Sequence, residues 1–381
     1  MKIFSLFLAK MKNRSLKIRL LVVFLFLFLF CVTLFAQNRT TSPFFYSLNY
    51  RTGENKPHRE VIKNLTYPYR GVDLKLGWQT IGNRDWQVAY RYPSLGVGLN
   101  WNTFKTDILG DPVAAYFFVN FPQVSTPWFR IDLEANLGLA YGIHPFNKYT
   151  NPNNMSTGSS FNAYIAFYLE QSFHVLPEFD VFVSEGLAHY SNGAMGWPNL
   201  GLNIPSLKFG VRQYLGQAEK RNKGKTFDFD RNFQIVTNLC GGIRRFSPIE
   251  YSGDRIYTYH EALLAPSLFY RIGYKRRLGV GFEVAYNEAK QEAIWWEPAL
   301  TDKELITCAV NCSHEFLINR FTILTQFGVY LSESPTDKWY YERIGFGYYV
   351  CNNLRALLNL KAHYIKAEYI EFGISYDLNL N

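Results

Sequence analysis

The fold class follows from F-D-V-F-V-S-E-G-L-A-H-Y-S, the stretch that runs from Phe179 to Ser191. In a β-strand successive side chains point to opposite faces, so every second residue shares a face. One face of this stretch is mostly apolar and turns polar at its end; it consists of Phe179, Val181, Val183, Glu185, Leu187, His189 and Ser191. The alternation predicts a long β-strand with one apolar face.

The same two-residue period recurs through the chain. In residues 277–287 and 370–378, apolar and aromatic residues on one face alternate with glycine and polar or charged residues on the other. A soluble β-sandwich has this period too, but strands of about ten or more residues, with aromatic residues outside and charges inside, are typical of transmembrane barrels. We expect about sixteen strands between residues 44 and 378, including one over 86–101.

The composition agrees with a barrel and excludes a helical membrane protein. Aromatic residues make up 18% of the chain, with 27 tyrosines and 32 phenylalanines. Beyond the N-terminal segment no apolar run reaches the roughly eighteen residues that a membrane-spanning helix needs.

The connections between the predicted strands alternate in length, as do the short periplasmic turns and long outer loops of bacterial barrels. The segment 216–230 breaks this rule, because it is long and charged where a short turn is due. It could mark a boundary between two eight-stranded halves. No second copy of the H-Y-S-N region appears beyond it, so we predict an all-β fold with a single transmembrane antiparallel barrel of about 14–16 strands.

The N-terminal segment has the pattern of a secretory signal peptide. Residues 1–19 carry six Lys/Arg and no acid, and residues 20–35 are almost wholly apolar. We expect residues 1–36 to be removed by cleavage after Ala36; an uncleaved membrane helix is the alternative. The mature chain, 37–381, would then contain a half with the site, 37–217, and a half with additional barrel strands, 218–381.

Loss of the signal peptide changes the charge of the protein. Removing its six positive charges lowers the formal net charge from +9 to about +3. This balance is not that of a nucleic-acid-binding protein, and it is compatible with a surface that meets anionic lipid head groups.

His189 and Ser191 form the first candidate site. They share a strand face and lie about 7 Å apart along the strand, so their side chains can lean together, as a nucleophile and its base require. Asn192 and Gly193 follow and could donate amide hydrogens to an oxyanion. The alternative is that all four are polar residues of an exposed turn, where Asn and Gly are favoured anyway.

The same residues carry a resemblance. H-Y-S-N-G, followed by P-N-L-G-L-N, resembles the H-x-S-N signature of PagL-type lipid A 3-O-deacylases. The closing stretch, residues 360–376, resembles the C-terminal end of longer bacterial acyloxyacyl hydrolases. The resemblance implies an outer-membrane serine esterase that removes an ester-linked acyl chain from lipid A of lipopolysaccharide, without a cofactor. The alternative is a non-catalytic, porin-like or structural outer-membrane barrel.

The chain departs from the family pattern at one position. The family's triad has a glutamate twelve residues after the serine, where this chain has Asn203. An asparagine can orient an imidazole, but it cannot offset the charge of an imidazolium. Either Asn203 takes this role across the hairpin from His189, or another carboxylate does. Glu185 shares the face of His189 but lies about 13 Å away along the strand, too far for direct contact.

Strand order predicts where the site lies in the membrane. The strand with His189 is the seventh, so it runs outward if the chain starts in the periplasm. His189 and Ser191 then lie at its outer end on the lipid-facing side, where the acyl chains of lipopolysaccharide are attached.

A metal site is not expected. Cys308, Cys312 and His314 share one strand face, but the first and last are about 20 Å apart, so one ion cannot bind all three. No phosphate loop, zinc signature or dinucleotide fingerprint is present in the sequence. The scattered cysteines also favour free thiols over disulfides.

Overall fold

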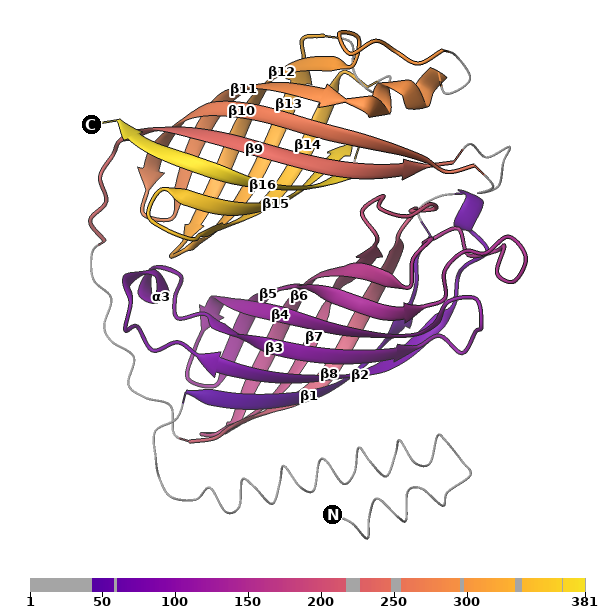
Figure 1. Cartoon of the computed structure of the whole chain (residues 1–381). Helices are drawn as coiled ribbons and strands as arrows, with labels where there is room; N and C mark the ends of the chain where they lie inside the picture. The colour runs from indigo at the N-terminus through magenta and orange to yellow at the C-terminus, as the bar shows by residue number, and fades with distance from the viewer. Residues whose placement is uncertain are drawn as a thin grey trace, which may run out of the picture.

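The computed structural model describes residues 43–57, 60–216, 227–247, 255–294, 298–332, 338–364 and 366–380. The antiparallel strands among them form two closed barrels of eight strands each (Figure 1). None of the helices in these ranges is long and apolar enough to cross a membrane. The predicted signal peptide and its cleavage site lie outside the described residues.

The first barrel joins eight consecutive strands, and the pairing of the first with the eighth closes it. These strands are β1 (Phe44–Glu54), β2 (Pro68–Gln79), β3 (Ser94–Thr103), β4 (Gly110–Ser125), β5 (Phe129–Ile143), β6 (Phe161–Leu176), β7 (Phe179–Ser191) and β8 (Leu202–Tyr214). Two short helices lie in its connections: η1 (Glu60–Ile62) and α3 (Asp85–Ala89).

The second barrel repeats this arrangement and closes through the pairing of its first and last strands. Its strands are β9 (Phe233–Phe246), β10 (Tyr257–Gly273), β11 (Arg276–Asn287), β12 (Ile306–Ile318), β13 (Phe321–Tyr330), β14 (Tyr340–Tyr349), β15 (Leu354–His363) and β16 (Lys366–Leu380). One short helix, η3 (Glu288–Ile294), follows β11.

The all-β class and the number of about sixteen strands are confirmed, but the prediction of one closed barrel of about 14–16 strands is wrong. The alternation of apolar and polar side chains identifies each strand. It does not indicate which strand pairs with the first one to close the barrel, because the pattern within a strand is the same in either case. The closing pairs, such as Phe45 with Tyr214, join residues far apart in the sequence. The segment 216–230, which breaks the loop-length rule, lies between the last strand of one barrel and the first of the other.

The predicted strand over 86–101 is wrong in its first part. Residues Asp85–Ala89 form α3, and β3 begins only at Ser94. The side chain of Gln87 holds the preceding turn, because its Oε1 accepts hydrogen bonds from the backbone N–H groups of Gly82 at 3.0 Å and Asn83 at 2.8 Å. A short apolar run cannot by itself distinguish a strand from a single helical turn.

The interior of the first barrel contains paired charges beside a cluster of buried aromatic residues that includes Tyr116 and Tyr164. Lys75 of β2 is buried and pairs with Glu134 of β5. Lys208 of β8 lies 3.4 Å from Glu134 and 3.6 Å from Asp73. A barrel of eight strands encloses just enough space for side chains, and a charge inside it needs a partner. The outward faces carry exposed apolar and aromatic residues instead.

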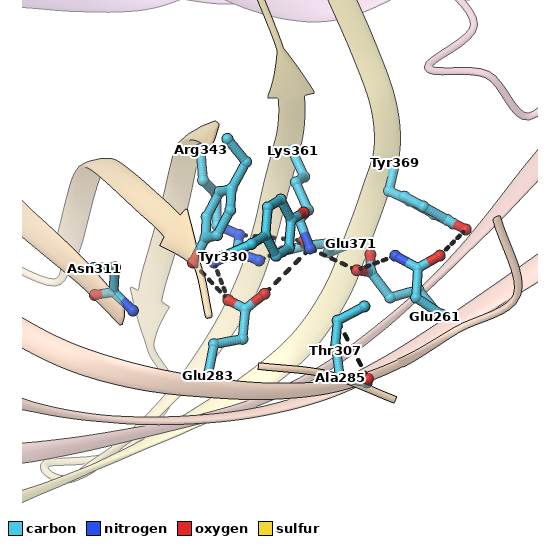
Figure 2. Close-up of polar contacts among 12 residues, drawn as sticks. Glu261, Glu283, Ala285, Thr307, Asn311, Tyr330, Arg343, Lys361, Tyr369 and Glu371 are labelled. Atoms are coloured by element: carbon cyan, nitrogen blue, oxygen red, sulfur yellow. Dashed lines mark hydrogen bonds and ion pairs between the residues drawn. The ribbon is translucent and has the colours of Figure 1, made fainter. Parts of the chain in front are cut away.

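The second barrel has a network of the same kind (Figure 2). The guanidinium of Arg343 lies 2.7 Å from a carboxylate oxygen of Glu283 and 2.8 Å from one of Glu371. Lys361 lies 2.7 Å from Glu261 and 3.1 Å from Glu283. These side chains come from strands around the barrel, so their ion pairs connect its walls across the interior.

The two barrels lie side by side with matching ends aligned (Figure 1). Tyr90, the residue after α3, lies at the end with the shorter turns. Its hydroxyl donates a hydrogen bond that is shared between the carbonyl oxygens of Leu317 at 3.1 Å and Lys275 at 3.4 Å. At the end with the longer loops, the backbone N–H of Arg245 donates to the carbonyl oxygen of Ala194 at 2.7 Å.

The interior network generates a stability prediction. Arg343→Met removes the positive charge that pairs with the buried carboxylates of Glu283 and Glu371 inside the second barrel. We therefore expect the free energy of unfolding to fall by a value on the order of 3–5 kcal/mol. Urea unfolding of the purified protein in detergent measures the change. Arg276→Met, at an exposed arginine at the start of β11, is the matched control. Equal unfolding midpoints for the two variants would contradict the prediction.

Candidate active site

The first candidate pair is formed by His189 of β7 and Asn203 of β8. The two residues are direct cross-strand partners, and His189 Nδ1 lies 2.6 Å from Asn203 Oδ1. Both side chains lie on the outward face, since their neighbours Ala188, Tyr190 and Ile204 are buried inside the barrel. The position therefore agrees with the face expected from the alternation.

Tyr190, between the two candidate catalytic residues, fixes the end of β7. Its ring packs against Tyr164 with 5.2 Å between ring centroids, and its hydroxyl accepts a hydrogen bond from Asn102 Nδ2 at 2.9 Å. Because neighbouring side chains in a strand point to opposite faces, anchoring Tyr190 inward holds His189 and Ser191 outward.

Ser191 ends the strand and is buried beneath the loop that follows it. Its hydroxyl donates to Asn199 Oδ1 at 3.1 Å, and the same oxygen accepts the backbone N–H of Asn192 at 3.0 Å. Among the hydrogen bonds of the described residues there is none between Ser191 and His189. Sequence analysis did not assign a site role to Asn199; its place in P-N-L-G, directly after the H-Y-S-N-G turn, is the signal that could have suggested one.

The turn after Ser191 presents one backbone donor to the serine. The N–H of Gly193 donates to Ser191 Oγ at 3.1 Å. The donors of Asn192 are already engaged: its backbone N–H by Asn199, and its side-chain amide by Thr157 and by the carbonyl of Pro198, each at 3.2 Å. Of the two predicted oxyanion donors, Gly193 is thus the one aimed at the nucleophile.

The long loop between β5 and β6 braces this site from the other side. Its Gly158 N–H donates to the carbonyl of Pro198 at 2.6 Å, and Ser156 accepts the N–H of Gly201 at 2.8 Å. A Cβ at Gly158 would lie 1.9 Å from the carbonyl oxygen of Trp197, so only glycine allows this approach. The two loops therefore hold each other over Ser191.

The remaining sequence candidates lie away from this cluster. Glu185 of β7 is exposed on the outward face, and its cross-strand partners are Leu169 of β6 and Leu207 of β8. Its carboxylate is therefore not beside the imidazole of His189. Within the described ranges, no group of three or more His, Cys, Asp or Glu could hold a metal ion. Cys308 and Cys312 are free thiols, as are Cys240 and Cys351.

Comparison with known families identifies the family to which the chain belongs. The family "Lipid A 3-O-deacylase (PagL)" matches residues 71–212, which lie in the first barrel. The family "Acyloxyacyl hydrolase, C-terminal domain" matches residues 232–380, which make up the second. The chain belongs to the lipid A 3-O-deacylase family. Membership of this deacylase family makes it an outer-membrane ester hydrolase.

Three solved structures that are similar to this deacylase share little sequence identity with it. The outer membrane enzyme PagL is 15% identical over 43% of this chain and 97% of its own, with a TM-score of 0.29. A triple mutant of the Rhodopseudomonas blastica porin is 8% identical over 88% of this chain and 100% of its own, with a TM-score of 0.18. An outer membrane protein of Acinetobacter baumannii is 7% identical over 88% of this chain and 97% of its own, with a TM-score of 0.17. No curated protein sequence matches the deacylase.

Gly201 packs against the imidazole and provides a test of the geometry. A Cβ at this position would lie 2.6 Å from His189 Cε1 and 3.2 Å from Nε2, so Gly201→Ala should push the ring away from Asn203. Because small displacements of a catalytic group can cost about a hundredfold in rate, we expect a loss of about that size in fatty-acid release from lipid A.

The control for this substitution is Gly142→Ala. Gly142 has a φ of +99° and Gly201 one of +74°, so both substitutions strain the backbone, but the nearest atom to a Cβ at Gly142 is a backbone oxygen at 3.2 Å. Folding of each variant is checked by heat-modifiable gel mobility. If both variants retained full activity, contact with the His189 ring would not matter for turnover.

Proposed function

We propose that the protein hydrolyses the ester bond that holds an acyl chain on lipid A, in the outer leaflet of the outer membrane. Ser191 is the nucleophile, His189 the general base, and Asn203 the residue that orients the imidazole. The observation that carries the proposal is the 2.6 Å contact between His189 Nδ1 and Asn203 Oδ1. His189 precedes Ser191 by two residues on β7, so the two share the outward face of that strand.

The contact with Asn203 selects the useful tautomer of His189. An amide oxygen only accepts hydrogen bonds, so His189 Nδ1 carries a hydrogen and donates a hydrogen bond to Asn203 Oδ1. Nε2 then keeps its lone pair and can take the proton of a serine hydroxyl. Asn203 fixes the ring without a negative charge, so it stabilises the imidazolium less than a carboxylate would.

The reaction proceeds in two steps. In the first, the Ser191 hydroxyl turns from Asn199 to His189 Nε2, Oγ attacks the ester carbonyl carbon, and the proton passes to Nε2. The sugar oxygen leaves with that proton, and the acyl chain stays on Oγ. In the second step, water gives a proton to Nε2 and its oxygen attacks the acyl carbon. The bond from that carbon to Ser191 Oγ then breaks, Oγ takes the proton back from Nε2, and the fatty acid is released. Catalytic hydrogen bonds are often absent from a free enzyme and form only with substrate bound.

The negative charge that develops on the carbonyl oxygen needs a donor. The Gly193 N–H, 3.1 Å from Ser191 Oγ, is the backbone group closest to that task. The sequence also predicts Asn192 as a donor to the oxyanion. Its backbone N–H can take this role only if it gives up its hydrogen bond to Asn199 Oδ1 and donates to the substrate oxygen instead.

The outward faces around the site suit an acyl chain and surrounding lipid. Ile165 of β6 pairs directly with His189, and Leu187 precedes His189 by two residues on the same face of β7. Leu207 of β8 lies further along this face, opposite Glu185. Hydrocarbon that lies along them stays in the membrane while the ester reaches Ser191. The proposed route to the site is therefore lateral, from the lipid. The proposal also includes a signal peptide, residues 1–36, that is cleaved after Ala36.

A porin-like function has less support. The paired charges of Lys75 and Glu134, and of Arg343 and Glu283, occupy the space that a channel would need. A non-catalytic barrel remains the outcome that the following variants would reveal.

The decisive variants are Ser191→Ala and His189→Ala. Each should lower the release of fatty acid from lipid A by about 10⁴-fold or more, and the double variant should lose little beyond either single one, because nucleophile and base act as a unit. Purified, heat-modifiable protein is mixed with lipid A in detergent micelles, and free fatty acid is measured. Release at the wild-type rate by Ser191→Ala would refute the esterase and leave the non-catalytic barrel.

A separate prediction concerns Asn203, where we expect alanine to lower turnover and glutamate to retain or raise it. Asn203→Ala should lower turnover by about a hundredfold or more while the barrel still folds, because the imidazole loses its orienting partner. Asn203→Glu should retain or raise activity, since a carboxylate at this position also offsets the charge on the imidazolium. Turnover is measured in the same assay. Unchanged deacylation by Asn203→Ala would remove this residue from the mechanism.

A further inference from the structure

The turn 192–195 beside the nucleophile adopts a backbone conformation that needs support. Gly193 and Ala194 have φ values of +61° and +63°. The left-handed region is open to glycine, but it is unfavourable for alanine, whose Cβ crowds the backbone there. Within the first barrel the turn is held by the bond from Met195 N–H to the carbonyl of Asn192 at 3.1 Å.

The second barrel supplies a further hydrogen bond to the same turn. The ladder between β9 and β16 ends at the pair Ile243–Ile370, two residues before Arg245. The backbone N–H of Arg245 donates instead to the carbonyl oxygen of Ala194, at 2.7 Å. An edge group left open by one barrel is thus satisfied by the active-site turn of the other, and the bond secures the residue with the unfavourable φ.

Ile370 of β16 makes the second contact. A Cβ at Gly193 would lie 1.9 Å from Ile370 Cδ1 and 2.2 Å from Cγ1, so the side chain packs directly against the glycine backbone. Ile370 is partly buried, whereas Ile374, which faces outward on the same strand, is 51% exposed. The contact therefore distinguishes Ile370 from its outward-facing neighbour.

We propose that the second barrel is part of the deacylase site: the β9 edge at Arg245 and the Ile370 side chain hold the turn 192–195, and with it the Gly193 N–H that donates to Ser191 Oγ. Arg245 and Ile370 are positioning residues, because they act through the turn and touch no reacting atom. The inference rests on the proposed function, since a positioned oxyanion donor has a role only if Ser191 attacks an ester. It gives the second barrel a task in the reaction itself.

The first experiment removes the side-chain contact. Ile370→Ala leaves space beside Gly193, so we expect kcat for fatty-acid release from lipid A in micelles to fall about tenfold while KM changes less than about twofold. A preorganised donor acts on the transition state and little on substrate binding, and complete loss of one costs about 10²–10³ in kcat. Ile370→Leu should restore kcat to within about twofold of wild type, and Ile374→Ala should leave it unchanged.

The second experiment removes the backbone hydrogen bond. Proline has no N–H, so Arg245→Pro deletes the donor to Ala194, whereas Arg245→Ala keeps it and removes the same guanidinium. We expect kcat of the proline variant to lie about tenfold below that of the alanine variant. All variants are first checked for heat-modifiable mobility, which reports closed, folded barrels.

The outcomes separate this inference from the proposed function. If the wild-type protein released no fatty acid, both would be overturned. An active wild type whose Ile370→Ala and Arg245→Pro variants kept full kcat would overturn only the positioning role. The same holds if KM rose while kcat stayed constant, or if Ile374→Ala lost as much as Ile370→Ala, because general packing between the barrels would then explain the effect.

Discussion

Backbone hydrogen bonding inside a membrane is the constraint on which the structure depends. Lipid offers no partners for open N–H and C=O groups, so a sheet that crosses it must close. The pairing of β1 with β8 closes the first sheet, and within that sheet β7 is paired on both edges, with β6 and with β8. The register is then set along the whole strand, and it brings His189 opposite Asn203. The requirement that backbone groups be paired is thus met at the candidate site by the β7–β8 hairpin, whose register sets the contact between His189 and Asn203.

The narrow interior that follows from eight strands has its own requirements. Charged residues such as Lys208 and Arg343 are held there by carboxylates from other strands, which ties the walls together across each barrel. The proposed catalytic residues face the outside instead, where two loops meet over Ser191. Function and stability therefore use opposite faces of the same strands, and the alternation along β7 separates them residue by residue.

Features that depend on local pattern were predictable from the sequence. The alternation from Phe179 to Ser191 gives the strand, its outward face and, through the return over Leu202, the approach of Asn203 to His189. Features that depend on distant residues were not. The alternation contains no information about which strand pairs with β1, so the closure after eight strands was missed. The contact of Ile370 with Gly193 joins two barrels through residues far apart in the chain, and no local signal marks it. Asn199 lies in a loop whose path depends on the β5–β6 loop against which it packs.

The outward position of the proposed catalytic residues, His189 and Ser191, has a kinetic consequence for the proposed reaction. A site that opens to the side of a barrel meets its substrate by lateral diffusion in two dimensions, and the amount of lipid A in bulk solution does not set the encounter rate. The relevant concentration is the mole fraction of substrate among the lipids around the protein. Inert lipid or detergent added to the same micelles acts as a surface diluent, which slows turnover without binding to the enzyme. For such an enzyme the composition of the leaflet is itself a rate parameter.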